Sequence, residues 1–187
     1  MERRSVATKP AKGTGGRPDL VDRKFEAEAP DRLHVAGITY GRMADGRSAY
    51  TASVTDVFAR RIVGRACATT MNTEEPPLQA LEQAIAWAAS RGGTDGLARH
   101  GDHGVQYTGT VGDSRDNAMA ESADGAYRTG LVWRRKPFHD PKDLGPATFR
   151  RVSWRNSKRL HRPLGYGTPE AVETEYYTNQ ASQAASL

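Results

Sequence analysis

Apolar and β-branched residues concentrate in three stretches near the start of the chain, at 32–40, 48–58 and 60–69, with polar residues and glycine between them. Stretches of this length and composition are typical of β-strands. The Ala-Asp-Gly at 44–46 is a hairpin turn signal, and a short turn at 56–59 links the second stretch to the third. Three strands with such tight connections predict an antiparallel meander.

The spacing of apolar residues becomes helical after the third strand. Thr73 is the expected N-cap, with two glutamates and two prolines in the first turn, and Gly92 and Gly93 mark the expected end. The apolar positions that recur at helical spacing are Leu78, Leu81, Ile85 and Ala88. Residues 95–102 then predict a short fourth strand that ends on Asp102.

Two more helices are expected in the second half, at 116–133 and 144–160. Gly125 and Gly130 each weaken the first of them by about 1 kcal/mol relative to alanine. The two ends of the chain are polar and lack an apolar period. The expected organisation is a flexible basic arm at 1–24, a core domain at 25–135, a basic helical extension at 136–177 and a disordered tail at 178–187.

The composition narrows the class of protein. A length of 187 residues suits one domain, but 37% hydrophobic residues, 19 glycines and 10 prolines indicate a modest core and many loop residues. Cys67 is the only cysteine, which excludes an internal disulfide, and its apolar strand makes it an expected core residue. No apolar run approaches the roughly 20 residues of a membrane span, and no signal-peptide stretch follows Arg4. We therefore expect a soluble, cytoplasmic protein with no membrane partner.

The net charge of +5 is unevenly distributed along the chain. Residues 128–162 contain eleven Lys and Arg residues against only Asp140 and Asp143, a local balance of +9. A localised basic block favours a polyanionic partner, because neutralised phosphates release condensed counterions. A solvated charged face would have the same composition, so charge alone leaves both interpretations open.

Six short motifs occur in a fixed order, and together they are far more specific than any one alone. They are RPDLVDRKF (17–25), HVAGITY (34–40), TDVFARRIVG (55–64), HGDHGVQYT (100–108), VGDSRDNAMAES (111–122) and KRLHRPLGY (158–166). On these motifs the chain resembles the catalytic subunit of bacterial insertion-sequence transposases with a retroviral-type integrase core. The expected element order agrees with the α/β, ribonuclease H-like fold that this resemblance implies.

The resemblance implies DNA transposition by two-metal phosphodiester chemistry. Two Asp and one Glu of the family hold a pair of Mg²⁺ or Mn²⁺ ions about 3.5–4 Å apart, which activate the attacking oxygen and stabilise the leaving one. Asp102 matches the second carboxylate and Glu121 the third, so both are the expected catalytic residues and metal ligands.

The implied partner is DNA, both the ends of the insertion sequence and the target. On the helix that carries Glu121, the residues Asn117 and Arg128 share its polar face, where a cation could hold the DNA backbone. Further DNA contacts are expected in the basic extension, from Arg155, Lys158, Arg159 and His161. No sequence-reading motif is present, so an upstream DNA-recognition subunit and a second copy of the chain are further candidate partners.

Two departures from the family pattern predict impaired catalysis. The family's first carboxylate precedes Ile/Leu-Thr-Tyr in the first strand, where this chain has Gly37. Asp102 and Glu121 are also only 19 positions apart, about half the family's usual gap. The short gap indicates a deletion of about 20 residues, enough for an edge strand and one helix. We expect the loss to leave the fourth strand as a sheet edge.

Two alternatives remain beside an active enzyme. A non-enzymatic remnant would keep the basic block and bind DNA without cutting it. A mononuclear metal site could instead use His100, Asp102 and His103, although on a strand His103 faces away from the other two.

Overall fold

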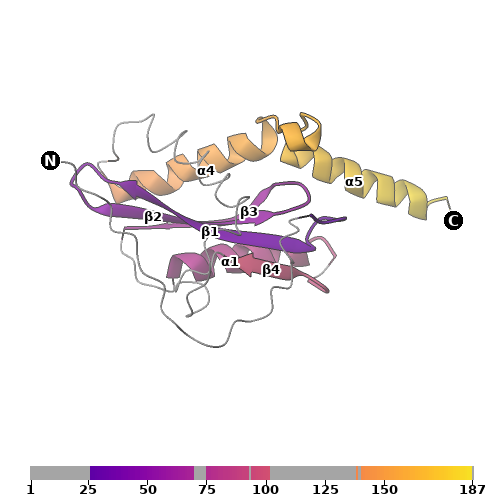
Figure 1. Cartoon of the computed structure of the whole chain (residues 1–187), viewed down its shortest axis with the longest axis horizontal. Helices are drawn as coiled ribbons and strands as arrows, with labels where there is room; N and C mark the ends of the chain where they lie inside the picture. The colour runs from indigo at the N-terminus through magenta and orange to yellow at the C-terminus, as the bar shows by residue number, and fades with distance from the viewer. Residues whose placement is uncertain (1–25, 70–74, 93, 102–137, 139, 187) are drawn as a thin grey trace.

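The computed structural model describes residues 26–69, 75–92, 94–101, 138 and 140–186. These residues form a four-stranded mixed sheet with a helix on each face (Figure 1). The strands are β1 (Leu33–Arg42), β2 (Ser48–Asp56), β3 (Ile62–Ala68) and β4 (Ala98–Gly101). The helices are α1 (Glu75–Ala89), α4 (Pro141–Ser157) and α5 (Pro169–Ala184), with a short 3₁₀-helix, η3 (Arg162–Leu164), between the last two.

The strand order in the sheet is β3-β2-β1-β4. β1 pairs antiparallel with β2, and β2 with β3, which confirms the predicted meander. The turn at 44–46 also forms as predicted, with Gly46 at a φ of +85°. β4 runs parallel to β1, and the crossover that a parallel neighbour requires contains α1.

Helix α1 packs closely on the sheet because position 64 has no side chain. A β-carbon at Gly64 would lie 1.9 Å from the carbonyl oxygen of Ala80. The core between helix and sheet is accordingly built from small residues, among them Ala36, Ala52, Ala80 and Ala84.

The apolar face expected for α1 is therefore only partly correct. Ala88 is buried, as predicted, whereas Leu78 and Ile85 are 52% and 45% exposed. The alanines of α1 pack on the sheet instead, because the short distance between helix and sheet leaves no volume for larger side chains in a densely packed core.

Helix α4 covers the opposite face of the sheet. Leu144 packs there with Met43 and Ala49, and the half-buried Cys67 lies against the same cluster. The Cys67 thiol donates to the Thr148 hydroxyl at 3.4 Å, which agrees with the packing role expected for this cysteine. The helix spans 141–157, so it begins and ends three residues earlier than expected.

The outer edge of β3 is closed by a side chain of α4. The Asn156 amide nitrogen donates to the Ile62 carbonyl at 2.9 Å, and its oxygen accepts from the Ile62 N–H at 3.1 Å. One side chain thus makes both hydrogen bonds that a further strand would make at that residue. The contact anchors the end of α4 to the sheet.

Helix α5 differs from the disordered tail expected at 178–187, because it continues to Ala184. Thr168 caps its start by accepting from the Ala171 N–H at 3.2 Å. Further along, the Thr178 hydroxyl donates to the Thr174 carbonyl at 2.9 Å, so polar side chains find partners within the helix. The helix extends past the end of α4 (Figure 1).

Several expected features lie outside the described residues. These are the basic arm at 1–24 and everything expected within 102–137, which includes the helix at 116–133. Among the helices that are described, none combines the length and the apolar content that a membrane span requires.

Candidate active site and nucleic-acid interface

The described pairing of β1 and β4 ends one residue before the two strand positions of the expected active site. Ala36 pairs with Gly101, and the next residues along the two strands are Gly37 and Asp102. Gly37 is buried and pairs on its other side with Ser53 of β2. Asp102 lies outside the described residues, as do the other three expected site residues between 103 and 137: Asn117, Glu121 and Arg128.

The described residues at this edge do not fit a pair of magnesium ions. Position 37 offers no side-chain ligand at all. Thr39 lies two residues on and faces the same side of β1, with a buried hydroxyl that has no hydrogen-bond partner among the described residues. A neutral hydroxyl cannot supply the charge of a bridging carboxylate.

A second polar cluster lies where β1 begins and β2 ends. His34 Nε2 is 3.0 Å from Asp31 Oδ1, and His34 pairs with Asp56 in the β1–β2 register. The Asp56 carboxylate accepts from the N–H groups of Asp31, at 3.0 Å, and Ala59, at 2.9 Å. These bonds shape the turn before β3.

The electrostatics of this cluster are dominated by burial. Burial raises the pKa of the Asp56 carboxyl to about 6, against the opposing effect of its bonds from the Ala59 and Asp31 N–H groups. Sequence reasoning did not find the cluster, because Asp31 and Asp56 are 25 positions apart. The pairing register of β1 and β2 is the signal that would have found it.

The residues of the basic extension differ in accessibility. Lys158 is exposed and Arg159 is half-buried, so both can meet a phosphate. Arg155 is only 9% exposed, and its Nη2 is 3.5 Å from the Arg60 carbonyl oxygen. Burial, together with the charges of Arg155, Arg159 and Arg60, lowers the pKa of His161 to about 4. His161 is therefore neutral at pH 7.

Two exposed aromatic side chains of α4 each lie next to an arginine. Phe149 is 56% exposed with the Arg65 guanidinium 4.6 Å from its ring centre, and Trp154 is 44% exposed with Arg151 at 4.5 Å. Exposed aromatic rings beside cations are a common feature of surfaces that bind nucleic acids.

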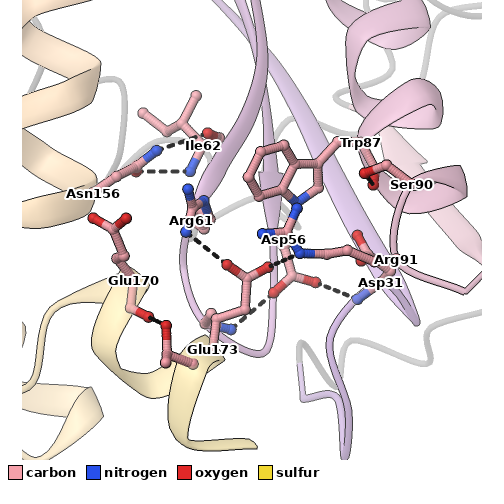
Figure 2. A network of polar contacts seen from close by, with 12 residues as sticks. Asp31, Asp56, Arg61, Ile62, Trp87, Ser90, Arg91, Asn156, Glu170 and Glu173 are labelled. Carbon is pink, nitrogen blue, oxygen red and sulfur yellow. Dashed lines mark hydrogen bonds and ion pairs between the residues drawn. The ribbon is translucent and has the colours of Figure 1, made fainter. Parts of the chain in front are cut away.

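Helix α5 is joined to the body of the protein by one buried carboxylate. Glu173 is 2.6 Å from Arg61 Nη1 and 3.4 Å from Arg91 Nε, and both guanidiniums lie over the ring of Trp87. Figure 2 shows this network beside Asp56. Each of the two arginines thus contacts both a carboxylate and an aromatic ring. These contacts link α5 to α1 and to the turn before β3.

The arrangement of the elements is that of a known fold. The antiparallel meander, the crossover through α1 and the parallel β4 are the arrangement of the ribonuclease H-like fold. The HTLV-2 integrase catalytic core domain, solved in complex with magnesium, has this fold. It matches with a TM-score of 0.57 at 13% identity, over 79% of this chain and 99% of that one.

Two curated relatives carry the assignment further. The putative transposase for insertion sequence element IS986/IS6110 of Mycobacterium tuberculosis is 39% identical over 203 residues, which cover 98% of this chain and 71% of that protein. The transposase for insertion sequence element IS629 of Shigella sonnei is 39% identical over 178 residues, 86% of this chain and 58% of that protein. No family model matches the chain. The chain belongs to the insertion-sequence transposases.

Proposed function

We propose that this chain is a transposase whose catalytic centre is impaired. The observation that carries the proposal is the position of Gly37. The described β1–β4 register ends at Ala36 and Gly101, one residue before Gly37 and Asp102 in the sequence. We infer that the pairing continues by one residue, so that a carboxylate at 37 would lie beside Asp102, because neighbouring strands are about 4.8 Å apart. Glycine leaves that place without a ligand.

The chemistry of the family explains why this loss is severe. Two divalent cations about 3.5–4 Å apart repel each other, and a carboxylate shared between them offsets the repulsion. Asp102 and Glu121 are the two ligands that remain by resemblance. With them alone, we expect weak binding of Mg²⁺ or Mn²⁺ and no strand transfer.

The number of aligned positions supports a second catalytic defect, the deletion expected between Asp102 and Glu121. The match to the Mycobacterium tuberculosis relative runs over 203 residues, but 98% of this 187-residue chain is only about 183 residues. About 20 positions of that match therefore have no counterpart here. A deletion of that size between Asp102 and Glu121 would hold Glu121 out of place, and a misplacement of about 1 Å can slow catalysis on the order of 10²-fold.

A non-enzymatic DNA-binding remnant is the second candidate function. The cations and aromatic rings near α4 favour this function, because they do not depend on the metal site. They are the exposed Lys158, the half-buried Arg159, and the rings of Phe149 and Trp154, each beside an arginine. We propose that this surface contacts the phosphate backbone of DNA in the cytoplasm. An upstream recognition subunit and a second copy of the chain are proposed as further partners.

The test is cleavage of a labelled DNA duplex in Mg²⁺ or Mn²⁺. The unmodified chain should not cut. Gly37→Asp should bind Mg²⁺ more tightly and recover at most partial cleavage, and Gly37→Asp/Glu121→Gln should lose what was recovered. Robust cleavage by the unmodified chain that Glu121→Gln alone abolishes would contradict the proposal.

A further inference from the structure

The cluster of Asp31, His34 and Asp56 has the donor set of a metal centre. One ligand atom from each residue lies within 4.8 Å of the other two. With metal–ligand bonds of about 2.0–2.2 Å, two atoms on one ion lie at most about 4.4 Å apart, so the widest separation needs to close only slightly. Side-chain rotation supplies a movement of that size.

The cluster is enclosed by protein. Asp31, His34 and Asp56 are 9%, 1% and 2% exposed, so bulk water does not solvate the two carboxylates. Burying two carboxylates together is unfavourable unless positive charge or hydrogen bonds compensate. Asp56 obtains that compensation from two backbone N–H groups.

Asp31 is not compensated to the same degree. Its Oδ1 atom contacts His34, which directs the carboxylate into the cluster. Its Oδ2 atom is buried and has no hydrogen-bond partner among the described residues. A buried acceptor in that state is rare and needs an explanation, such as an ion.

The neighbouring charges do not fill this role. Glu173, on α5, binds both Arg61 and Arg91, so these arginines already have a carboxylate partner beside the cluster. Tyr177 also comes from α5, and burial followed by the charges of Asp31 and Glu173 raises the pKa of its phenol. The surroundings therefore favour an added cation.

We propose that Asp31, His34 and Asp56 bind one divalent transition-metal ion of the Zn²⁺ or Mn²⁺ type. Two carboxylates and an imidazole are the ligands these ions prefer, whereas Mg²⁺ seldom accepts an imidazole. The ion takes the lone pair of His34 Nε2, which requires the ring proton on Nδ1. It joins the start of β1 to the turn between β2 and β3, and so stabilises the fold.

This site is separate from the integrase-type centre. His34 and Gly37 are three residues apart on β1, so a side chain at position 37 would point to the face opposite that of His34, about 10 Å away along the strand. Ion binding at this cluster therefore does not depend on whether the chain cuts DNA.

The experiment uses the full chain, stripped with a chelator and titrated with Zn²⁺, Mn²⁺ or Mg²⁺. Calorimetry should give one Zn²⁺ or Mn²⁺ per chain and weaker binding of Mg²⁺, and the bound ion should raise the melting temperature. Bound Co²⁺ should show the absorption bands of a site with oxygen and nitrogen ligands. A chain that binds none of the transition ions at one per molecule would overturn the proposal and leave a shared proton as the cluster's counter-charge.

Four variants locate the ion. Asp31→Asn and His34→Gln should each weaken Zn²⁺ binding at least tenfold, and Glu82→Gln, which removes an exposed carboxylate of α1, should not. Asp102→Asn/Glu121→Gln should bind Zn²⁺ like the unmodified chain. Binding that survives in Asp31→Asn, or that is lost in the double variant, would place the ion elsewhere and refute the site.

Discussion

Two glycines of the sheet lack a side chain for different reasons. Gly64 lies under α1, where the carbonyl of Ala80 occupies the place of a β-carbon. Gly37 lies in the expected active site, at a position where the family carries a carboxylate. The first absence lets helix and sheet pack closely, and the second removes a ligand. The presence of glycine alone does not tell a packing role from the loss of a ligand.

The packing role of Gly64 predicts a clear effect of one methyl group. Gly64→Ala should lower the free energy of unfolding by about 1–3 kcal/mol, because α1 must move away from β3. The matched control is Gly145→Ala on α4, where a β-carbon meets nothing within 4 Å. That change should alter the free energy of unfolding much less, because the gain in helix propensity is opposed by the restriction that Pro146 places on a β-carbon before it. Urea unfolding followed by circular dichroism measures both, and an unchanged midpoint for Gly64→Ala would contradict the close contact.

At the scale of elements, the C-terminal helix depends on the body of the protein. α5 is mostly polar and exposed, and its two buried residues are Pro169 and Glu173. Helices in proteins gain most of their stability from tertiary contacts rather than from helix propensity, and α5 has few apolar contacts to supply it. The pairing of Glu173 with Arg61 and Arg91 is therefore the main electrostatic link between α5 and the sheet.

Removing that carboxylate should release α5. Glu173→Gln leaves two arginines that are only 13% and 29% exposed without their counter-charge, and should destabilise the protein by about 3 kcal/mol. Hydrogen exchange should rise first in α5. Glu175→Gln, an exposed position on the same helix, is the control and should change little. Equal exchange in the two variants would show that α5 is held by other contacts.

At the scale of the whole molecule, positive charge is concentrated in one segment of the chain. The basic segment 128–162 has a balance of +9, although the whole chain carries only +5. Within it, the structure separates accessible cations such as Lys158 from the buried Arg155. Only the accessible ones can release counterions from DNA.

DNA affinity should therefore fall steeply with salt and depend on few residues. Neutralising Lys158 and Arg159 together should reduce the slope of log K against log salt by about 2, if each contacts one phosphate. Fluorescence anisotropy with a labelled duplex measures the slope. Arg47→Gln, which removes an exposed arginine from the β1–β2 turn, should leave it unchanged. An unaltered slope in the double variant would assign the two cations to a solvated face.

Local sequence patterns determined the strands, the order of the elements and the family. The stretches at 32–40, 48–58 and 60–69 became β1, β2 and β3, because strand propensity and turn residues act over only a few positions. Gly37 was also visible as a departure, since a motif is a local property of the chain. The residues at 102–137 that would complete the site lie outside the described part, so Asp102 and Glu121 stay predictions.

Tertiary structure decided the properties that depend on distant residues. Because Gly64 has no side chain, α1 packs on the sheet through its alanines and leaves Leu78 and Ile85 exposed. The ion pairs of Glu173 hold α5 in place, and this helix continues into residues that were expected to be a polar tail. Burial of Arg155 against Arg60 likewise joins positions 95 residues apart. The cluster around His34 exists because strand pairing brings Asp56 beside it. Burial and pairing are set by segments that are remote in sequence, so no local pattern could have shown them.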